Sequence, residues 1–216
     1  MAKKFVWKSP NLPEVFEYTE NEILENEDEE IYSTEFINVV NSNEDFYNYT
    51  FTKVVFKKCK FNNISFGKCM FDDVVFDNCS FSECDFSNSN FGVVEFINSN
   101  YRNSDFSESS FYCASFDNCN FKYANFTKCR VNGFKDVNSD FSNTFFAECR
   151  LIELNLSKTS FKFTDFFQTP LKNIDFSDCN IEGIVVSENK DELKGIIVNQ
   201  FQAIDLARMF GIKIKE

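Results

Sequence analysis

The stretch FDDVVFDNCSFSECDFSNSNFGVVEF, residues 71–96, places a phenylalanine at every fifth position. The same spacing continues on both sides, since the 28 positions counted in fives from 46 to 181 hold 21 Phe, one Tyr, five aliphatic residues and a single Asp. An amphipathic helix needs apolar residues every three to four positions, and a half-buried strand needs them every two. A period of five is typical of neither, so it indicates a repeat architecture.

A second series, of mostly smaller residues such as Val74, Cys79 and Cys84, lies two positions before the large ones. If each five-residue unit forms one side of a square, four units form a coil of 20 residues, and successive coils stack as parallel strands about 4.8 Å apart. Each large side chain then points inward onto the residue 20 positions away, and each small one lies near a corner. The remaining positions are mostly Asn, Asp, Ser, Lys and Glu, as expected of a solvated wall with many turns.

The units Cys-Ser-Phe-Ser-Glu (79–83) and Cys-Asp-Phe-Ser-Asn (84–88) have the form A/C/S/T/V-x-F-x-x, which resembles the pentapeptide-repeat family. The resemblance covers about two thirds of the chain, with no inserted loop between 46 and 181. It implies an all-β solenoid, the right-handed quadrilateral β-helix of that family. Because this fold is shared by proteins with different roles, the resemblance fixes the fold more closely than the function.

The ends of the chain depart from the repeat. Residues 1–45 carry three Lys and twelve acidic residues, and Ile31 and Phe36 are already in phase, so coiling is expected to begin near 31. Apolar residues between Phe5 and Tyr18 predict a strand or a capping segment over the first coil. We therefore expect three parts: an acidic N-terminal cap (1–30), the β-helix (31–186), and a linker followed by a dimerisation helix and a short strand (187–216).

The nine cysteines allow two interpretations, a core filler or a metal or disulfide framework. Eight of them occupy the small inward position, and only Cys113 departs from it. Pairs such as Cys59 and Cys79 would stack closely enough for a disulfide, but a reducing cytosol opposes one. Free Cys behaves as a small buried hydrophobe, so we interpret the eight as core filler.

Asp136 is the one acidic residue in the large inward series, and Phe134 stands where a small residue belongs. An unpaired buried carboxylate would cost several kcal/mol. We expect residues 132–138 to bulge, helped by Gly133, so that Phe134 or Val137 fills the core and Asp136 turns to solvent. A binding notch is the alternative.

The composition opposes enzymatic chemistry. There is no histidine, which removes the commonest general base and the Ser/His and Cys/His pairs. No glycine-rich phosphate loop or EF-hand spacing occurs, and a pI near 4.6 opposes binding to nucleic-acid phosphates. We expect no catalytic, cofactor-binding or metal-binding residues. Without an apolar run near 18 residues or a secretory leader, we expect a cytoplasmic protein that does not enter a membrane.

The C-terminal segment predicts a helix with Asn199 as N-cap and Gly211 just beyond its end. Its apolar residues exceed the single stripe needed to cover the last coil, and Ile212 and Ile214 predict a short strand. The tail is similar to the segment through which many pentapeptide-repeat proteins form two-fold dimers, which implies a homodimer joined end to end through residues 196–215. The candidate interface residues are Phe201, Ile204, Ala207, Met209, Phe210, Ile212 and Ile214.

The resemblance also implies a function. Quinolone-resistance members of the family are acidic, rod-shaped dimers thought to resemble duplex DNA and to bind DNA gyrase or topoisomerase IV. By that resemblance this chain is expected to be a DNA mimic, and the alternative is a generic structural or protein-interaction solenoid with an unknown partner and no topoisomerase role. The candidate mimicking charges are Asp72, Asp77, Asp85, Glu95, Asp105 and Asp117.

Overall fold

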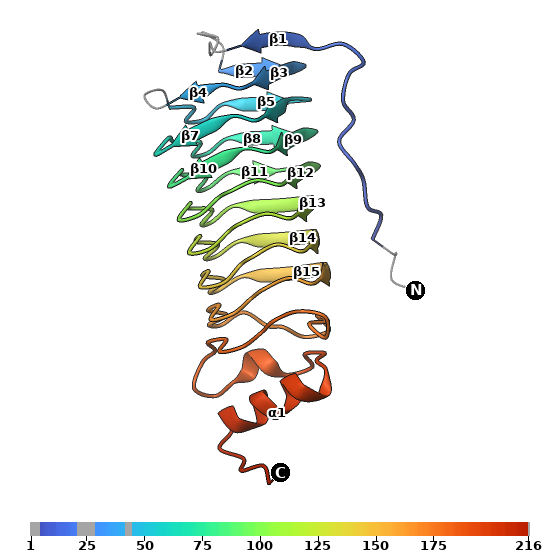
Figure 1. Cartoon of the computed structure of the whole chain (residues 1–216), viewed down its shortest axis with the longest axis vertical. Coiled ribbons are helices and arrows are strands. Elements are labelled where there is room, and N and C mark those ends of the chain that lie inside the picture. The colour runs from blue at the N-terminus through green and yellow to red at the C-terminus, as the bar shows by residue number, and fades with distance from the viewer. Residues whose placement is uncertain (1–4, 21–28, 42–44, 216) are drawn as a thin grey trace.

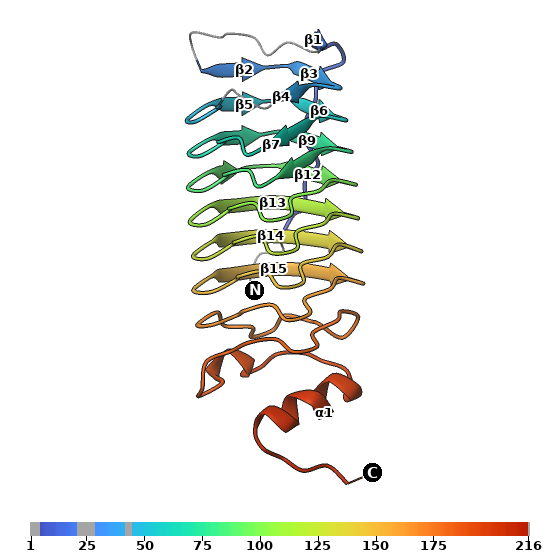
Figure 2. The same cartoon turned by 60° about the vertical axis from the view of Figure 1, so that its left-hand side comes forward.

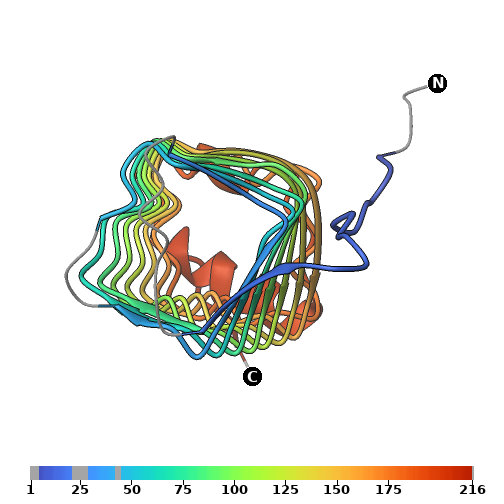
Figure 3. The same cartoon turned by 90° about the horizontal axis from the view of Figure 1, so that it is seen from above.

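The computed structural model describes residues 5–20, 29–41 and 45–215. These residues form a four-sided parallel β-solenoid whose coils stack along the long axis of the molecule (Figure 1). Viewed down that axis, the coils superimpose as a square tube (Figure 3). Along the solenoid, each paired residue lies 20 positions from its partner on the next coil, as in Phe56 with Phe76, so the predicted fold is confirmed. The spacing changes only at the two ends, to 17 between Glu17 and Thr34 and to 22 between Asp175 and Ile197.

The four walls are named faces 1 to 4 in chain order. Faces 1 and 2 belong to one continuous sheet that also contains β1 (Glu17–Glu20), while face 3 begins with short strands and continues as isolated bridges from Asn100 onward. Face 4 consists of isolated bridges between Ser65 and Val185. Face 1 contains β2 (Glu30–Tyr32), β5 (Thr50–Thr52), β8 (Met70–Asp72) and β11 (Asn90–Phe91), and face 2 contains β3 (Thr34–Ile37), β6 (Val55–Lys57), β9 (Val74–Asp77) and β12 (Val94–Ile97). In the following coils, single longer strands run along both faces, namely β13 (Ser110–Asp117), β14 (Arg130–Val137) and β15 (Arg150–Ser157). Face 3 begins with β4 (Val40–Asn41), β7 (Lys60–Asn62) and β10 (Ser80–Ser82).

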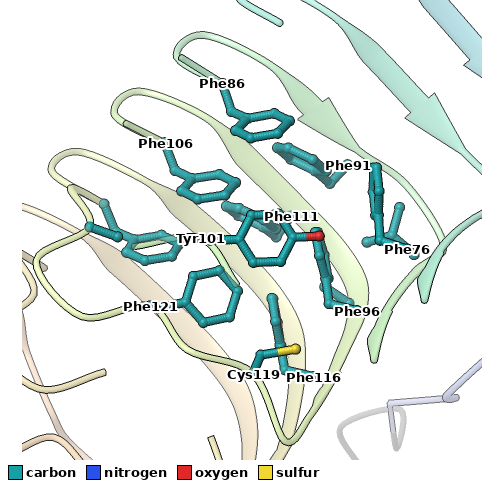
Figure 4. Close-up of a cluster of buried hydrophobic side chains, with 14 of the residues drawn as sticks. Phe76, Phe86, Phe91, Phe96, Tyr101, Phe106, Phe111, Phe116, Cys119 and Phe121 are labelled. Atoms are coloured by element: carbon teal, nitrogen blue, oxygen red, sulfur yellow. The ribbon is translucent and has the colours of Figure 1, made fainter. Parts of the chain in front are cut away.

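The interior is filled by columns of stacked rings, one column for each face (Figure 4). Phe86 lies over Phe106 with ring centroids 4.8 Å apart and planes 3° apart, and Phe106 lies over Phe126 at 4.9 Å and 2°. These three side chains are at most 1% exposed. Burying each Phe contributes roughly 1.5–3 kcal/mol, so the ring spacing set by the strands also gives the core its stability.

The corners require left-handed backbone. The residue two positions after each large inward residue has a positive φ throughout most of the solenoid, for example 54° at Asn78 and 49° at Asn98. Asn adopts this region more readily than most residues. Between faces 2 and 3 the side chains form a ladder, in which Asn118 Nδ2 donates to Asn98 Oδ1 at 2.8 Å and Asn138 Nδ2 donates to Asn118 Oδ1 at 3.2 Å.

The cysteines are free thiols, and seven of the eight in the small series are buried inside the tube at the corners, while Cys179 is half-buried. Five of these thiols donate to a carbonyl group of the preceding coil, as Cys69 does to the Phe46 oxygen at 2.8 Å. Burial raises the pKa of the Cys69 and Cys149 thiols to about 12, although backbone hydrogen bonds partly oppose it. The interpretation of these residues as core filler is confirmed.

The expectation for Asp136 was wrong. β14 pairs in unbroken register with its neighbours, so there is no bulge, and Asp136 points inward with 0% exposure. Phe134 does enter the core, where its ring stacks 4.4 Å from that of Phe116. Because Phe134 fills the space that a ring at position 136 would take, the smaller carboxylate is left facing the interior. Its Oδ2 accepts a hydrogen bond from the Thr159 hydroxyl, whereas its Oδ1 has no partner.

Both ends of the solenoid are covered by described segments of the chain. At the N-terminal end, β1 pairs in parallel with β3 over the first coil, so the predicted capping segment is limited to residues 17–20. Residues 5–16, which supplied most of its apolar side chains, run down the outside of the tube instead (Figures 1 and 2). At the other end, the short 3-10 helix η1 (Asp191–Leu193) places Glu192 in the base, where its carboxylate accepts a hydrogen bond from Gln168 N at 2.8 Å.

The terminal helix α1 (Gln200–Met209) begins where the sequence predicted. The Asn199 side chain accepts from the backbone of residues 201 and 202, and Gly211 follows the helix with a φ of +77°. The predicted strand at Ile212 and Ile214 was wrong, since residues 212–215 form no strand. A strand needs a neighbour to pair with, and no described segment of this chain lies alongside them in register.

Candidate protein-binding surfaces

The six candidate acidic residues lie on three different faces. Strand register places Asp72 on face 1, places Asp77, Glu95 and Asp117 on face 2, and stacks Asp85 directly on Asp105 on face 4. The structure therefore brings together a trio and a pair rather than one acidic wall. Within the described part of the chain, none of the six forms an ion pair.

The pair on face 4 has a structural role that the sequence analysis missed. Asp85 Oδ1 accepts a hydrogen bond from Ser87 N at 2.8 Å, and Asp105 Oδ1 accepts one from Ser107 N at 2.9 Å. Asp165 holds Phe167 N in the same way at 2.8 Å. This two-residue turn satisfies a backbone donor at the corner. The signal was present in the sequence as Asp or Asn directly before the large residue.

The three carboxylates on face 2 form fewer hydrogen bonds within the chain than the pair on face 4 does. Asp77 and Asp117 stand in one column with Ile97 between them, two strand spacings or about 10 Å apart, and Glu95 lies beside them on the intervening strand. Asp77 accepts a hydrogen bond from its neighbour Asn78 Nδ2 at 2.6 Å, while the carboxylates of Glu95 and Asp117 form no hydrogen bond or ion pair with the described residues. This trio concentrates negative charge on one wall.

Face 1 carries a basic groove that sequence reasoning did not identify. It has a volume of about 450 Å³, and Arg130 lies opposite Arg150 on adjacent strands along it. Neither guanidinium has an ion-pair partner in the ranges that the structure describes. Like charges stacked in register destabilise a sheet, so the groove favours an anionic group from outside the chain. The spacing of 20 between the two arginines was the available signal.

The terminal helix leaves an apolar surface uncovered. Phe201 is 69% exposed, Phe210 57% and Ile204 37%, whereas Ala207 and Met209 are half-buried against the rest of the chain. A groove of about 410 Å³ lies between the helix and the base, lined largely by apolar side chains. Of the seven predicted interface residues, five therefore face solvent, including Ile212 and Ile214.

The described residues were also compared with the requirements of a metal site and of a membrane span. There, no group of three Cys, Asp or Glu side chains is arranged to hold a metal ion. None of the helices described is long and apolar enough to span a bilayer.

Solved structures with similar repeats include two forms of QnrB1, described as a plasmid-mediated fluoroquinolone resistance protein, and HetL from the cyanobacterium Nostoc, described as a pentapeptide-repeat protein involved in heterocyst differentiation regulation. A trypsin-treated QnrB1 variant is 17% identical, with a TM-score of 0.47 over 84% of this chain and 100% of that one. Full-length QnrB1 is 21% identical, with a TM-score of 0.38 over 85% and 90%. HetL is 13% identical, with a TM-score of 0.39 over 78% and 91%. No curated protein sequence matches the chain.

Two family models match the sequence. One, described as a pentapeptide repeat region, matches residues 30–106, and the other, described as pentapeptide repeats in eight copies, matches 89–127 and 137–173. The second match breaks off across the segment that contains Phe134 and Asp136, where the two side chains have exchanged roles in the core. Together the matches cover more than half of the chain, and the protein belongs to the pentapeptide-repeat family.

Proposed function

We propose that this protein is not an enzyme and that it acts by binding another protein through the outer walls of the solenoid. The observation that supports this is the division of side chains between inside and outside. The apolar residues of each coil fill the closed core, so the features that distinguish one coil from the next face solvent. The uncompensated charges on faces 1, 2 and 4 are such features.

DNA gyrase and topoisomerase IV are the partners to test first, because quinolone-resistance members of the same family suggest them. In this proposal carboxylates on the outside of the solenoid replace DNA phosphates in a cationic channel, and electrostatic complementarity steers the encounter. The trio on face 2 is the better candidate surface, since the carboxylates of Asp85 and Asp105 are partly engaged by backbone donors.

The test is a titration of gyrase supercoiling with the purified full-length protein, with and without a quinolone. We expect inhibition, or relief of the quinolone block, at micromolar concentrations. A variant carrying Asp77→Asn, Glu95→Gln and Asp117→Asn should lose at least tenfold in potency, because it removes three charges without shortening a side chain. The Asp85→Asn and Asp105→Asn variant is the matched comparison, since Asn keeps the turn hydrogen bond, and it should lose less.

An unaltered gyrase reaction at these concentrations would exclude the topoisomerase role. The alternative function, a generic interaction or structural module, is favoured by the dispersal of the six acids over three faces. In that case, the same charge variants used as baits in a pull-down from the source cell would identify which face retains a partner.

We further propose a homodimer joined through the terminal helix. Exposed Phe201, Ile204 and Phe210 would be covered by a second copy, whose own helix fits the apolar groove beside α1. Phe201→Glu should convert the dimer to a monomer in sedimentation velocity, because a charge would be buried at the interface. Asp205→Asn, an exposed polar position on the same helix, should remain dimeric. Unchanged dimerisation of Phe201→Glu would refute this interface.

A further inference from the structure

Residues 5–16, here called the arm, follow the outer corner between faces 1 and 2 without regular secondary structure. Figures 1 and 2 show the arm running from β1 back along the stacked coils, and Figure 3 shows it outside one corner of the tube. The corner positions beneath it are 73, 93, 113 and 133, one from each of four successive coils. The arm therefore contacts a surface built from residues up to 128 positions away in sequence (133 − 5).

Two places on the arm are held by hydrogen bonds. Asn11 N donates to Asp73 Oδ1 at 2.9 Å, while Lys8 N donates to Cys113 Sγ at 2.9 Å and the thiol donates back to the Lys8 oxygen at 3.4 Å. These contacts lie three residues apart on the arm and two coils apart on the corner, about 10 Å in each case, so the arm is extended there. Pro10 and Pro13 favour extended backbone and lack the N–H that a strand would need.

Phe5 anchors the far end of the arm. A Cβ at Gly133 would lie 2.1 Å from Phe5 Cζ, so the ring occupies the space that any side chain at 133 would take. The ring also contacts Tyr112, with centroids 6.0 Å apart, and Trp7 at 4.9 Å. Gly133 therefore serves the docking of the arm in addition to its own left-handed φ of +89°.

This corner differs from its counterpart between faces 2 and 3. There the equivalent residues are polar in four successive coils, namely Asn78, Asn98, Asn118 and Asn138. Under the arm they are Asp73 followed by Val93, Cys113 and Gly133, and Cys113 is only 2% exposed although it points away from the tube. These small and apolar corner residues form the surface that the arm covers.

The arm itself buries little of its apolar surface. Val6 is 70% exposed, Val15 82% and Trp7 38%, so much of the apolar surface of the arm faces solvent. Segments with few buried contacts open locally at a small fraction of the global unfolding free energy. Because the arm has few buried contacts, it can leave the corner and be replaced by another peptide while the tube stays folded.

We propose that this corner is a docking groove for an extended, proline-containing peptide with an aromatic anchor, and that residues 5–13 of the chain occupy it reversibly. Specificity comes from three requirements: a ring over Gly133, a backbone N–H and C=O pair at Cys113, and a backbone N–H at Asp73. Lifting the arm exposes a recognition surface four coils long that is otherwise closed. The proposal does not depend on which partner the charged faces bind.

The experiment uses the full-length chain, with Cys113 as the reporter, because it is the only one of the nine cysteines outside the small inward series. Iodoacetamide labelling is followed residue by residue with mass spectrometry. Phe5→Ala, which leaves the tube unaltered, should raise the Cys113 labelling rate at least tenfold while the labelling rates of the other eight thiols do not change. A synthetic peptide of residues 1–16, added at millimolar concentration, should restore protection.

Two groove variants complete the design. Gly133→Asn keeps the left-handed turn but fills the place of the Phe5 ring, so Cys113 should label fast and the peptide should not protect it. Glu153→Asn, at the same corner one coil beyond the arm, should behave as the unaltered protein. Fluorescence of Trp7, the only tryptophan, should shift to the red when the arm lifts. Unaltered labelling in Phe5→Ala, absence of protection by the peptide, or equal protection of Gly133→Asn would each overturn the proposal.

Discussion

Exchanging the side-chain roles at positions 134 and 136 is expected to stabilise the protein. The double variant Phe134→Ala with Asp136→Phe recreates the pattern Ala-x-Phe found one coil earlier at Ala114 and Phe116. It removes a fully buried carboxylate with an unpaired oxygen and places a ring in register beneath Phe116. We expect a gain of roughly 2–4 kcal/mol in unfolding free energy at pH 7, because the cost of burying the charge disappears.

The single variants should behave differently from the pair. Phe134→Ala alone leaves a cavity beside the carboxylate and should cost about 3–5 kcal/mol. Asp136→Phe alone places two rings in the space of one and should also destabilise, by about 1–3 kcal/mol. The coupling is therefore strongly favourable in a double-mutant cycle measured by urea unfolding.

The reverse exchange in the regular coil, Ala114→Phe with Phe116→Asp, is the matched control and should destabilise. A double variant at 134 and 136 less stable than the natural chain at pH 7 would contradict this account of the core.

The second expected result concerns pH. Burial raises the pKa of Asp136 from 3.8 to about 6, although hydrogen bonds from Ser139 and Thr159 partly offset it. Because the folded state binds this proton more tightly than the unfolded state, the native chain loses stability as pH rises from about 4 to about 6, and the loss is complete above that range. The stability lost over this range is roughly 3 kcal/mol.

The effect of Asp136 is isolated by comparison with Asp136→Asn, which has a similar shape and does not titrate. The difference in unfolding free energy between the variant and the natural chain should be small near pH 4, grow in favour of Asn up to pH 6, and then remain constant. Asp117→Asn, an exposed acid on the same face, controls for the loss of one charge. A difference that does not change between pH 4 and pH 7 would show that the carboxylate does not titrate as stated.

The repeat was readable from sequence because its signal is redundant. A ring at every fifth position from Phe46 to Phe126, with Tyr101 as the one substitute, leaves few other ways to bury so many aromatic side chains. The burial of the corner cysteines and the helix N-cap at Asn199 were likewise predictable, because each depends only on a short local sequence pattern. In each case, the residue type and its spacing were sufficient.

The sequence did not predict the orientation of Asp136 or the course of the arm, because both depend on contacts with other coils. Nothing in the spacing indicates that strand pairing would hold Asp136 inward against the cost of burying it, because many ladder hydrogen bonds oppose one side chain. Residues close in sequence, such as Asp77 and Asp85, lie on different walls, so proximity along the chain does not indicate a shared acidic surface. The course of the arm depends on Gly133 and Cys113, far from Phe5 in sequence, so no local pattern predicts it.

The strict register of 20 residues between coils has a geometric consequence for how such a rod presents its surfaces. Each five-residue unit advances the chain by a quarter turn, so the azimuth of any exposed feature is fixed by counting units along the chain. Insertion of one unit would swing everything beyond it through about 90° while leaving the stacking of rings intact, and insertion of four would only lengthen the rod by about 4.8 Å. The angle between the arm's corner and the terminal helix is therefore adjustable in discrete steps, independently of the core.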